Sequence, residues 1–196
     1  MKRLFCLLVV ACLAMLSAAP ALAVEASEAP GAKPLAVGSA FPDVTLVGEL
    51  SPEAAASLGL APGPARASLN SLRPEVLVFE VFSMYCPFCQ KDAPSVNALN
   101  ELVAKRGLSN RIAVIGVGAG NSATEVEVFR KTFAVPFPLF ADPDFAVHGQ
   151  VGKVGTPFFY VLKKKPDGGY VVAGASLGVM DSPAEFLSRI TRAAGI

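Results

Sequence analysis

The strongest constraint on the fold is a seven-residue run, six of them apolar, that leads into a pair of cysteines. Residues 76–82 read VLVFEVF, and such a run is typical of a central strand that is covered on both faces. The cysteines follow in the sequence CPFC, as Cys86 and Cys89, and apolar residues then recur at helical spacing as far as Lys105. The sequence therefore predicts that Cys86 lies between a buried strand and a helix, which Pro94 should kink.

The rest of the chain predicts an α/β fold with a mixed central sheet flanked by helices and an N-terminal strand extension. The order of elements indicates parallel strands joined by crossover helices, followed by an antiparallel C-terminal hairpin. Capping boxes at 122–125 and 182–185 open two of the helices. Residues 49–68 are interpreted as a surface excursion. Further strands are predicted at 41–48, 112–117, 136–140, 157–162 and 170–175, and further helices at 52–58, 123–133, 143–151 and from 183 onward.

The N-terminus has the order of a secretory signal peptide. Two basic residues at positions 2 and 3 precede the apolar run Leu4–Ala19, and Ala-Leu-Ala follows at 21–23. The run is too short for a typical spanning helix, so we expect cleavage after Ala23 and export to the periplasm. An alternative is a lipoprotein in which Cys12 carries the anchor. Residues 24–38 are interpreted as a flexible tether, and residues 39–196 as a single domain.

The composition and net charge of the chain limit the kinds of molecule that it is expected to bind. The chain has 196 residues, of which 53% are hydrophobic and 17% charged, which suits one well-buried domain. Removing residues 1–23 takes away two of the 17 basic residues and leaves 15 against 16 acidic ones, a net charge of about −1. We therefore expect no nucleic-acid partner, and we expect a monomer.

The cysteine pair points to redox chemistry. The exported chain keeps only Cys86 and Cys89 of the four cysteines. A disulfide across so short a loop would stabilise the fold little, and a zinc site would need ligands other than the single distant histidine, His148. We therefore expect Cys86 to attack disulfides from a helix N-terminus, Cys89 to resolve the mixed disulfide, and no cofactor.

Two carboxylates are candidates for proton transfer. Glu80 interrupts the apolar run, and burial should raise its pKa toward the range in which it can exchange a proton with Cys89. Asp92 follows Cys89 by three residues, so it lies on the same helical face and is a second candidate. The alternatives are a solvated Glu80 and an ordinary surface charge at Asp92.

These motifs together resemble the thioredoxin superfamily. The strand, the CPFC pair, the kinked helix and Gly155-Thr156-Pro157 before another strand are similar to the exported TlpA-like and ResA-like thiol:disulfide reductases, with a domain of the AhpC/TSA and redoxin type. The resemblance covers about residues 39–194 and implies a thioredoxin fold with a cis proline at position 157. It also implies protein dithiol or disulfide substrates and a membrane thiol reductase as electron donor. Substrate contacts are then expected at Tyr85, Pro87, Phe88, Thr156 and Pro157.

Departures from that family leave the direction of electron flow open. Tyr85 stands where the family usually has tryptophan, and the dipeptide Pro87-Phe88 looks more like the glutaredoxin or Dsb pattern. A thiol peroxidase is an alternative function, because residues 83–86 faintly resemble the Thr-x-x-Cys peroxidatic motif. Another alternative function is a module that binds and delivers a soft metal ion, for which Met84 could add a sulfur ligand beside the cysteines.

Overall fold

The computed structural model describes residue 31 and residues 33–196. The predicted signal peptide, the alternative lipid site at Cys12 and most of the predicted tether lie outside the described residues. Within the described part, every helix is too short or too polar to cross a membrane.

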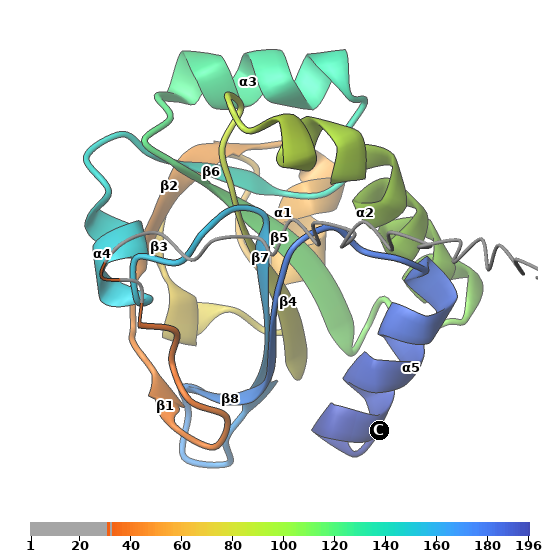
Figure 1. Cartoon of the computed structure of the whole chain (residues 1–196). Coiled ribbons are helices and arrows are strands. Elements are labelled where there is room, and N and C mark those ends of the chain that lie inside the picture. The colour runs from red at the N-terminus through yellow and green to blue at the C-terminus, as the bar shows by residue number, and fades with distance from the viewer. Residues whose placement is uncertain (1–30, 32) are drawn as a thin grey trace, which may run out of the picture.

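One mixed sheet of eight strands forms the centre of the domain (Figure 1). Its strand order is β1-β8-β7-β4-β5-β6-β2-β3, which places β4 and the cysteine pair in the middle. The pairs β4–β5 and β5–β6 are parallel, and β7 and β8 form an antiparallel hairpin, as the sequence predicts. Strand β7 also pairs antiparallel with β4. The strands are β1 (Ala40–Phe41), β2 (Thr45–Leu50), β3 (Gly63–Ser68), β4 (Val76–Phe82), β5 (Ile112–Ala119), β6 (Leu139–Asp142), β7 (Phe158–Lys164) and β8 (Tyr170–Leu177).

The helices cover both faces of this sheet. Helices α2 and α5 pack against each other on one face, and α4 lies on the other side of the molecule (Figure 1). Ser122 caps α3 in the predicted capping box, and Ser182 accepts a hydrogen bond at the start of α5. The helices are α1 (Pro52–Leu58), α2 (Pro87–Lys105), α3 (Ala123–Thr132), α4 (Ala146–Gln150) and α5 (Pro183–Ala194), with a 3-10 turn at Leu69–Ser71.

Alternation along β4 divides the core into two clusters. All seven residues of β4 are buried, and successive side chains of a strand point to opposite faces. Leu77, Phe79 and Val81 belong to the cluster that includes residues of α1 and α4. Val78 and Phe82 belong to the other cluster, which includes residues of α2, α3 and α5 and contains Cys89. Glu80 has the same parity as Val78 and Phe82 and therefore faces the helix that carries the cysteines.

The predicted strand at 41–48 is two strands with different partners. Strand β1 pairs with β8, whereas β2 pairs with β3 and β6. Pro42 has no backbone N–H to donate, which interrupts a ladder. Next to it, the Asp43 carboxylate accepts hydrogen bonds from the Ser68 hydroxyl and the Asn70 N–H. Proline and this turn chemistry explain the break.

The interpretation of residues 49–68 as a surface excursion is wrong at both ends, because residues 49–50 belong to β2 and the last six residues form β3. Residues 63–68 form β3, which pairs with β2 over six residues and is the last strand of the sheet. The sequence GPARAS has few residues that favour strands, so the pairing depends on β2. The predicted strand at 136–140 likewise begins later, at Leu139, because two prolines at 136 and 138 precede it.

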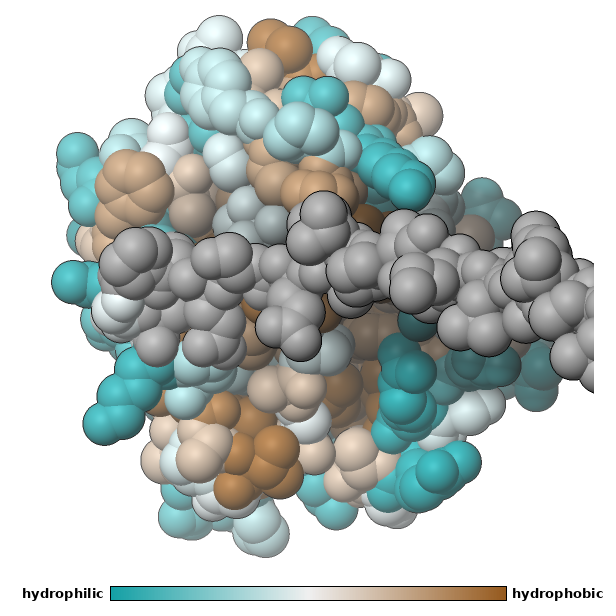
Figure 2. Space-filling model, viewed as in Figure 1, coloured by the Kyte–Doolittle hydropathy of each residue, from teal (hydrophilic) through white to brown (hydrophobic). Residues whose placement is uncertain are grey.

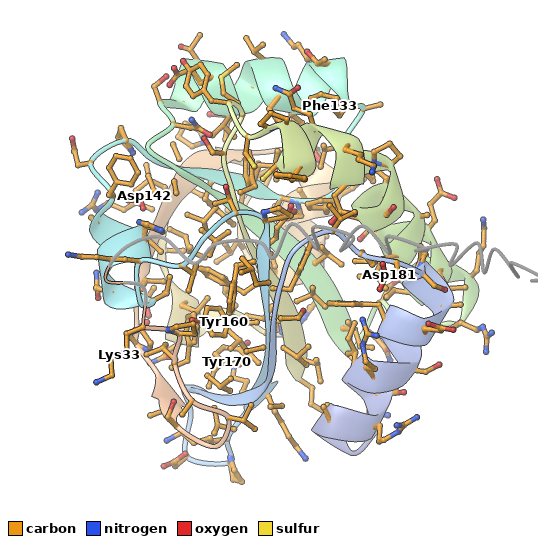
Figure 3. All side chains as sticks on the ribbon, viewed as in Figure 1. Lys33, Phe133, Asp142, Tyr160, Tyr170 and Asp181 are labelled. Carbon is orange, nitrogen blue, oxygen red and sulfur yellow. The ribbon has the colours of Figure 1, made fainter. Side chains whose placement is uncertain are left out.

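Part of the predicted tether lies against the domain. The Lys33 N–H donates to the Gly152 carbonyl at 2.8 Å, and the Leu35 N–H donates to the Tyr160 hydroxyl at 3.0 Å. Gly38 donates to Val172 in the same way. Figure 3 shows Lys33 near the edge of the molecule and Tyr160 further inside, where Tyr160 is fully buried. Residues 33–38 are therefore held at the surface of the domain.

Candidate active site at the cysteine pair

The first cysteine occupies the N-cap position of α2. Cys86 is half-buried and has extended backbone angles, and Pro87 is the first helical residue. Burial by itself would raise the pKa of Cys86. Hydrogen bonds from the Thr156 side chain and from the N–H groups of Cys89 and Phe88 favour the thiolate, and together they outweigh burial and hold the pKa of Cys86 below its ordinary value. A thiolate at this position is a nucleophile near neutral pH.

The second cysteine lies one turn further along and is inaccessible. Cys89 is fully buried in the cluster between β4 and the helices. Burial is the main reason why its pKa lies far above the ordinary value, and the negative charges of Cys86 and Glu80 add to the effect. Both cysteines are free thiols. The pair is therefore asymmetric, with an accessible acidic thiol and a buried thiol that needs a base.

Glu80 lies in the dry layer beneath the cysteines, as the sequence predicts. It is 4% exposed, and its neighbours in the sheet are Gly116 on β5 and Phe159 on β7. Burial raises the pKa of Glu80 to about 8, with a smaller contribution from the Asp92 charge. The alternative of a solvated Glu80 is therefore wrong. A carboxyl with this pKa can both accept and release a proton near neutral pH.

Asp92 is also buried, which contradicts its interpretation as a surface charge. Its side chain lies on the inner face of α2, and its Oδ1 accepts a hydrogen bond of 3.0 Å from the Met180 N–H. Its Oδ2 has no hydrogen-bond partner within the described residues. Burial raises the pKa of Asp92 to about 6, although the Met180 N–H and the nearby Ser95 oppose the rise. The site thus contains two buried carboxyls, and the charge of Asp92 adds to the rise in the pKa of Glu80.

The predicted cis proline borders the first cysteine. The Thr156–Pro157 peptide bond is cis, and the Cys86 thiol donates to the Thr156 carbonyl with a sulfur–oxygen distance of 3.2 Å. His148 lies behind this loop, with its Nε2 atom 2.8 Å from the Val154 carbonyl oxygen. This contact indicates a structural role for His148.

Tyr85 and Phe88 form the exposed rim of the site. Tyr85 is 65% exposed and Phe88 is 57% exposed. The Tyr85 hydroxyl donates to the Glu125 carboxylate at the start of α3, so the residue in the usual tryptophan position is fixed to a neighbouring helix. Together with Pro87, Thr156 and Pro157, these residues bring the predicted substrate contacts to one place.

Asn121 is a site residue that the sequence analysis did not identify. It is fully buried in the turn after β5, and its Oδ1 accepts a hydrogen bond of 2.8 Å from the Met84 N–H. Its Nδ2 has no partner within the described residues. Asn121 therefore anchors the loop that carries Cys86. The sequence did contain a signal for this residue. Asn121 follows the strand predicted beside the one that leads to Cys86, and the ends of parallel neighbours meet at the same edge of the sheet.

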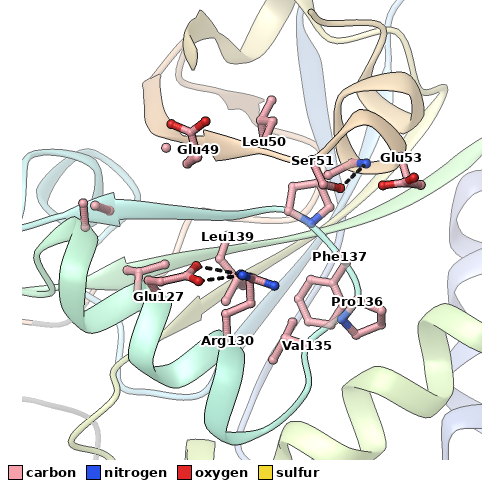
Figure 4. A pocket seen from close by; sticks show the side chains of 16 residues that line it. Glu49, Leu50, Ser51, Glu53, Glu127, Arg130, Val135, Pro136, Phe137 and Leu139 are labelled. Carbon is pink, nitrogen blue, oxygen red and sulfur yellow. Dashed lines mark hydrogen bonds and ion pairs between the residues drawn. The ribbon is translucent and has the colours of Figure 1, made fainter. Parts of the chain in front are cut away.

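A cavity of about 620 Å³ lies apart from the cysteine pair (Figure 4). One wall is the segment 48–54, and the opposite wall is α3, where Glu127 and Arg130 form an ion pair of 2.6 Å. Buried apolar residues, including Val135, Phe137 and Leu139, form its floor. None of the predicted site residues lines this cavity. Within the described residues, no group of three or more potential metal ligands occurs.

Comparisons with solved structures identify the fold. The thioredoxin domain of a thiol-disulfide oxidoreductase from Bacteroides vulgatus superposes with a TM-score of 0.57 at 16% identity, covering 80% of this chain and 99% of that one. A thiol:disulfide interchange protein of the thioredoxin family from Chlorobium tepidum gives 0.54 at 21% identity, with coverage of 82% and 100%. A secreted Mycobacterium tuberculosis disulfide oxidoreductase homologous to E. coli DsbE gives 0.53 at 19% identity, with coverage of 76% and 96%.

The expectation of a thioredoxin fold is therefore confirmed. No curated protein sequence matches this chain. The Redoxin family matches residues 36–172, a span that contains the cysteine pair, both buried carboxyls and the cis proline. Because this match covers well over half of the sequence, the chain belongs to the Redoxin family and has its thioredoxin-like fold.

Proposed function

We propose that this protein is a thiol:disulfide oxidoreductase that uses Cys86 and Cys89, and that it acts as a disulfide reductase outside the cytoplasmic membrane. The observation that carries the proposal is the asymmetry of the pair. The pKa of Cys86 is lowered at the start of α2, whereas Cys89 is fully buried and its pKa is raised. This arrangement suits an attacking thiolate and a resolving thiol.

The reaction consists of two exchanges. The Cys86 thiolate attacks one sulfur of a partner disulfide, so that a mixed disulfide forms and the partner's other sulfur leaves as a thiolate. Cys89 then loses its proton and attacks the Cys86 sulfur, which releases the second partner thiolate. The protein ends with a Cys86–Cys89 disulfide, and the partner ends with two thiols. The same steps in reverse oxidise a partner.

Glu80 is the proposed acceptor of the Cys89 proton. Its carboxylate is close enough for its charge to raise the pKa of Cys89, and it lies on the face of β4 that packs against α2. Asp92 is proposed to assist, because its charge raises the pKa of Glu80 and its own pKa is about 6. Proton transfer by a placed carboxyl typically contributes a factor of about 10² to 10⁴ to a rate.

Single replacements of the two cysteines test the assigned roles. Cys86→Ser should abolish reduction of a model protein disulfide, whereas Cys89→Ser should still attack and should accumulate mixed disulfides with partners. Non-reducing gels followed by mass spectrometry measure these adducts. Equal trapping by both variants would mean that the roles are assigned wrongly.

Export is proposed from the sequence of residues 1–23, and the mature chain should begin at Val24. N-terminal sequencing of the protein from its native cells tests this point, and a retained leader or a lipid on Cys12 would contradict it. A membrane thiol reductase is the proposed electron donor. Alkylation of cysteines in cells tests the direction of electron flow, because a reductase keeps the pair mostly reduced and an oxidase keeps it mostly oxidised.

A further inference from the structure

One half-exposed aromatic side chain, Phe145, lies outside the segment that carries the cysteines. Apolar residues form separate patches among hydrophilic ones on the face shown in Figure 2. Tyr85 and Phe88 are also exposed, and each directly precedes one of the two cysteines in the sequence. Phe145 is 53% exposed and comes from a distant segment, at the start of α4. The exposed large apolar residues are Val37, Val47, Tyr85, Phe88, Val128 and Phe145.

The backbone of Phe145 is strained. Its φ is 57° and its ψ is 24°, which is the left-handed region that disfavours residues with a bulky side chain. Among the described residues, Ala134 and Lys153 are the other non-glycine residues with positive φ, and neither is aromatic. Glycine or asparagine would relieve the strain at position 145. Strain of this kind is concentrated at functional sites.

A buried carboxylate maintains this conformation. Asp142 is 3% exposed and lies beside α4 (Figure 3). Its two oxygens accept hydrogen bonds from the N–H groups of Val147, at 3.0 Å, and His148, at 2.8 Å. Its carbonyl also accepts a hydrogen bond from the Phe145 N–H at 3.2 Å. The turn therefore forces Phe145 into the left-handed region and directs its ring outward.

The Phe145 ring lies over the first of two loops that hold Cys86. The ring covers Gly120, where an added Cβ would collide with it. The next residue, Asn121, is hydrogen-bonded to the Met84 N–H in the loop before Cys86.

The second loop is the one that contains the cis proline. The Phe145 ring centroid is 5.6 Å from that of His148. The His148 ring contacts the Val154 carbonyl, and the chain then reaches Thr156, which contacts the Cys86 sulfur. Phe145 is therefore linked through Gly120 and His148 to both loops that contact the Cys86 segment.

We propose that Phe145 is a specificity-determining residue that contacts protein substrates, and that it favours segments with an apolar side chain beside the reacting disulfide. The inference rests on the proposed thiol:disulfide exchange. Phe145, together with Tyr85 and Phe88, gives the site exposed aromatic rings from two separate segments of the chain. An extended substrate segment that brings a disulfide to Cys86 would cover the Phe145 ring. A small polar disulfide would not reach it.

The test compares disulfides that differ only next to the cysteine. Two synthetic peptides carry the same internal disulfide, with either leucine or serine adjacent to one cysteine, and oxidised glutathione is the small disulfide. The measured quantity is the second-order rate constant for oxidation of the reduced mature protein. We expect the wild type to prefer the leucine peptide by about three- to tenfold, the range for one aromatic contact.

The variant Phe145→Asn removes the ring and tolerates the left-handed backbone, so it should fold at least as stably as the wild type. We expect its preference for leucine to fall close to one, while its rate with oxidised glutathione stays within about twofold of the wild type. Phe145→Leu should retain part of the preference. The matched control is Val47→Thr, which changes an exposed apolar residue on β2, three strands from β4, and should leave the preference unchanged.

The outcomes separate the two proposals. A wild type that oxidises readily but shows no preference for leucine, or a Phe145→Asn variant that keeps the preference, would overturn the role of Phe145 and leave the exchange activity intact. A wild type that reacts with none of the three disulfides would overturn the proposed function and, with it, the inference.

Discussion

Replacing Glu80 with glutamine tests the buried base by its effect on stability as well as on rate. Glutamine has nearly the same shape as glutamate but cannot ionise. Because Glu80 is 4% exposed in the middle of β4, its ionised form is destabilised by the loss of water. The variant therefore removes a charge that the folded protein disfavours while it keeps the packing of the central strand.

The size of the effect follows from the pKa of Glu80, which is about 8 in the folded protein against an ordinary value of 4.5. Between these pH values the folded protein keeps the proton and the unfolded chain has lost it. The free energy of unfolding therefore falls as pH rises, by about 1.4 kcal/mol per pH unit. The accumulated penalty is about 3 kcal/mol at pH 7 and about 4 kcal/mol at pH 8, and it levels off at about 5 kcal/mol near pH 9.

Urea unfolding of both proteins at pH 5, 7 and 8.5 measures this dependence. We expect Glu80→Gln to be more stable than the wild type by about 1 kcal/mol or less at pH 5, by about 3 kcal/mol at pH 7, and by more at pH 8.5. A difference that does not change with pH would mean that Glu80 does not titrate in this range, and the argument from burial would be wrong.

The same variant should be a poorer enzyme. Cys89 would lose its proton acceptor, so resolution of the mixed disulfide should slow by about ten- to a thousandfold. The first attack by Cys86 should be unaffected, because its nucleophilicity arises from Thr156 and the start of α2. Stopped-flow measurement of adduct formation and decay separates the two steps. Full activity with the expected gain in stability would mean that Glu80 is buried but transfers no proton.

Three further predictions concern neighbouring residues. Asp92→Asn should stabilise the protein by about 1 to 3 kcal/mol above pH 6 and have little effect near pH 4. The pKa of Asp92 is raised from 3.8 to about 6, so the cost of burying its charge accumulates between those pH values. Urea unfolding near pH 4 and above pH 6 measures this difference. Asn121→Leu removes the acceptor of the Met84 N–H and should raise the pKa of Cys86, which the pH dependence of alkylation reports, whereas Asn121→Asp keeps an acceptor and should leave the loop in place. Ser122→Ala removes the cap of α3 and should cost about 1 kcal/mol of stability in thermal unfolding.

The sequence predicted the centre of the domain well because each signal there is local. The apolar run of β4, the helix that begins after Cys86, and the strand after Pro157 all lie within a residue or two of their predicted positions. Burial of Glu80 was also predictable, because apolar residues on both sides of it leave no wet face for its side chain. These inferences need only the period of a strand or helix and the chemistry of single residues.

Strand pairing at the edge of the sheet was harder to predict from the sequence. Residues 63–68 have little intrinsic preference for a strand, and they form β3 because β2 offers its free backbone groups. The break between β1 and β2 likewise depends on Asp43 meeting Ser68 and Asn70, residues some 25 positions away. Contacts of this kind are set by the fold and leave no periodic signal in either segment.

The residues around Cys86 show the same distinction within the site. The lowered pKa of Cys86 follows partly from its place at the start of α2, which the strand–turn–helix pattern of the sequence predicts, and partly from Thr156, which is 70 residues away. Asn121 contacts the Cys86 loop only because β5 lies beside β4 in parallel, so that the turns after both strands meet at one edge. Phe145 reaches the same edge through β6, the next parallel strand, and the Asp142 turn that follows it. The sequence thus indicates the reacting groups, and the parallel order of β4, β5 and β6 determines which further side chains surround them.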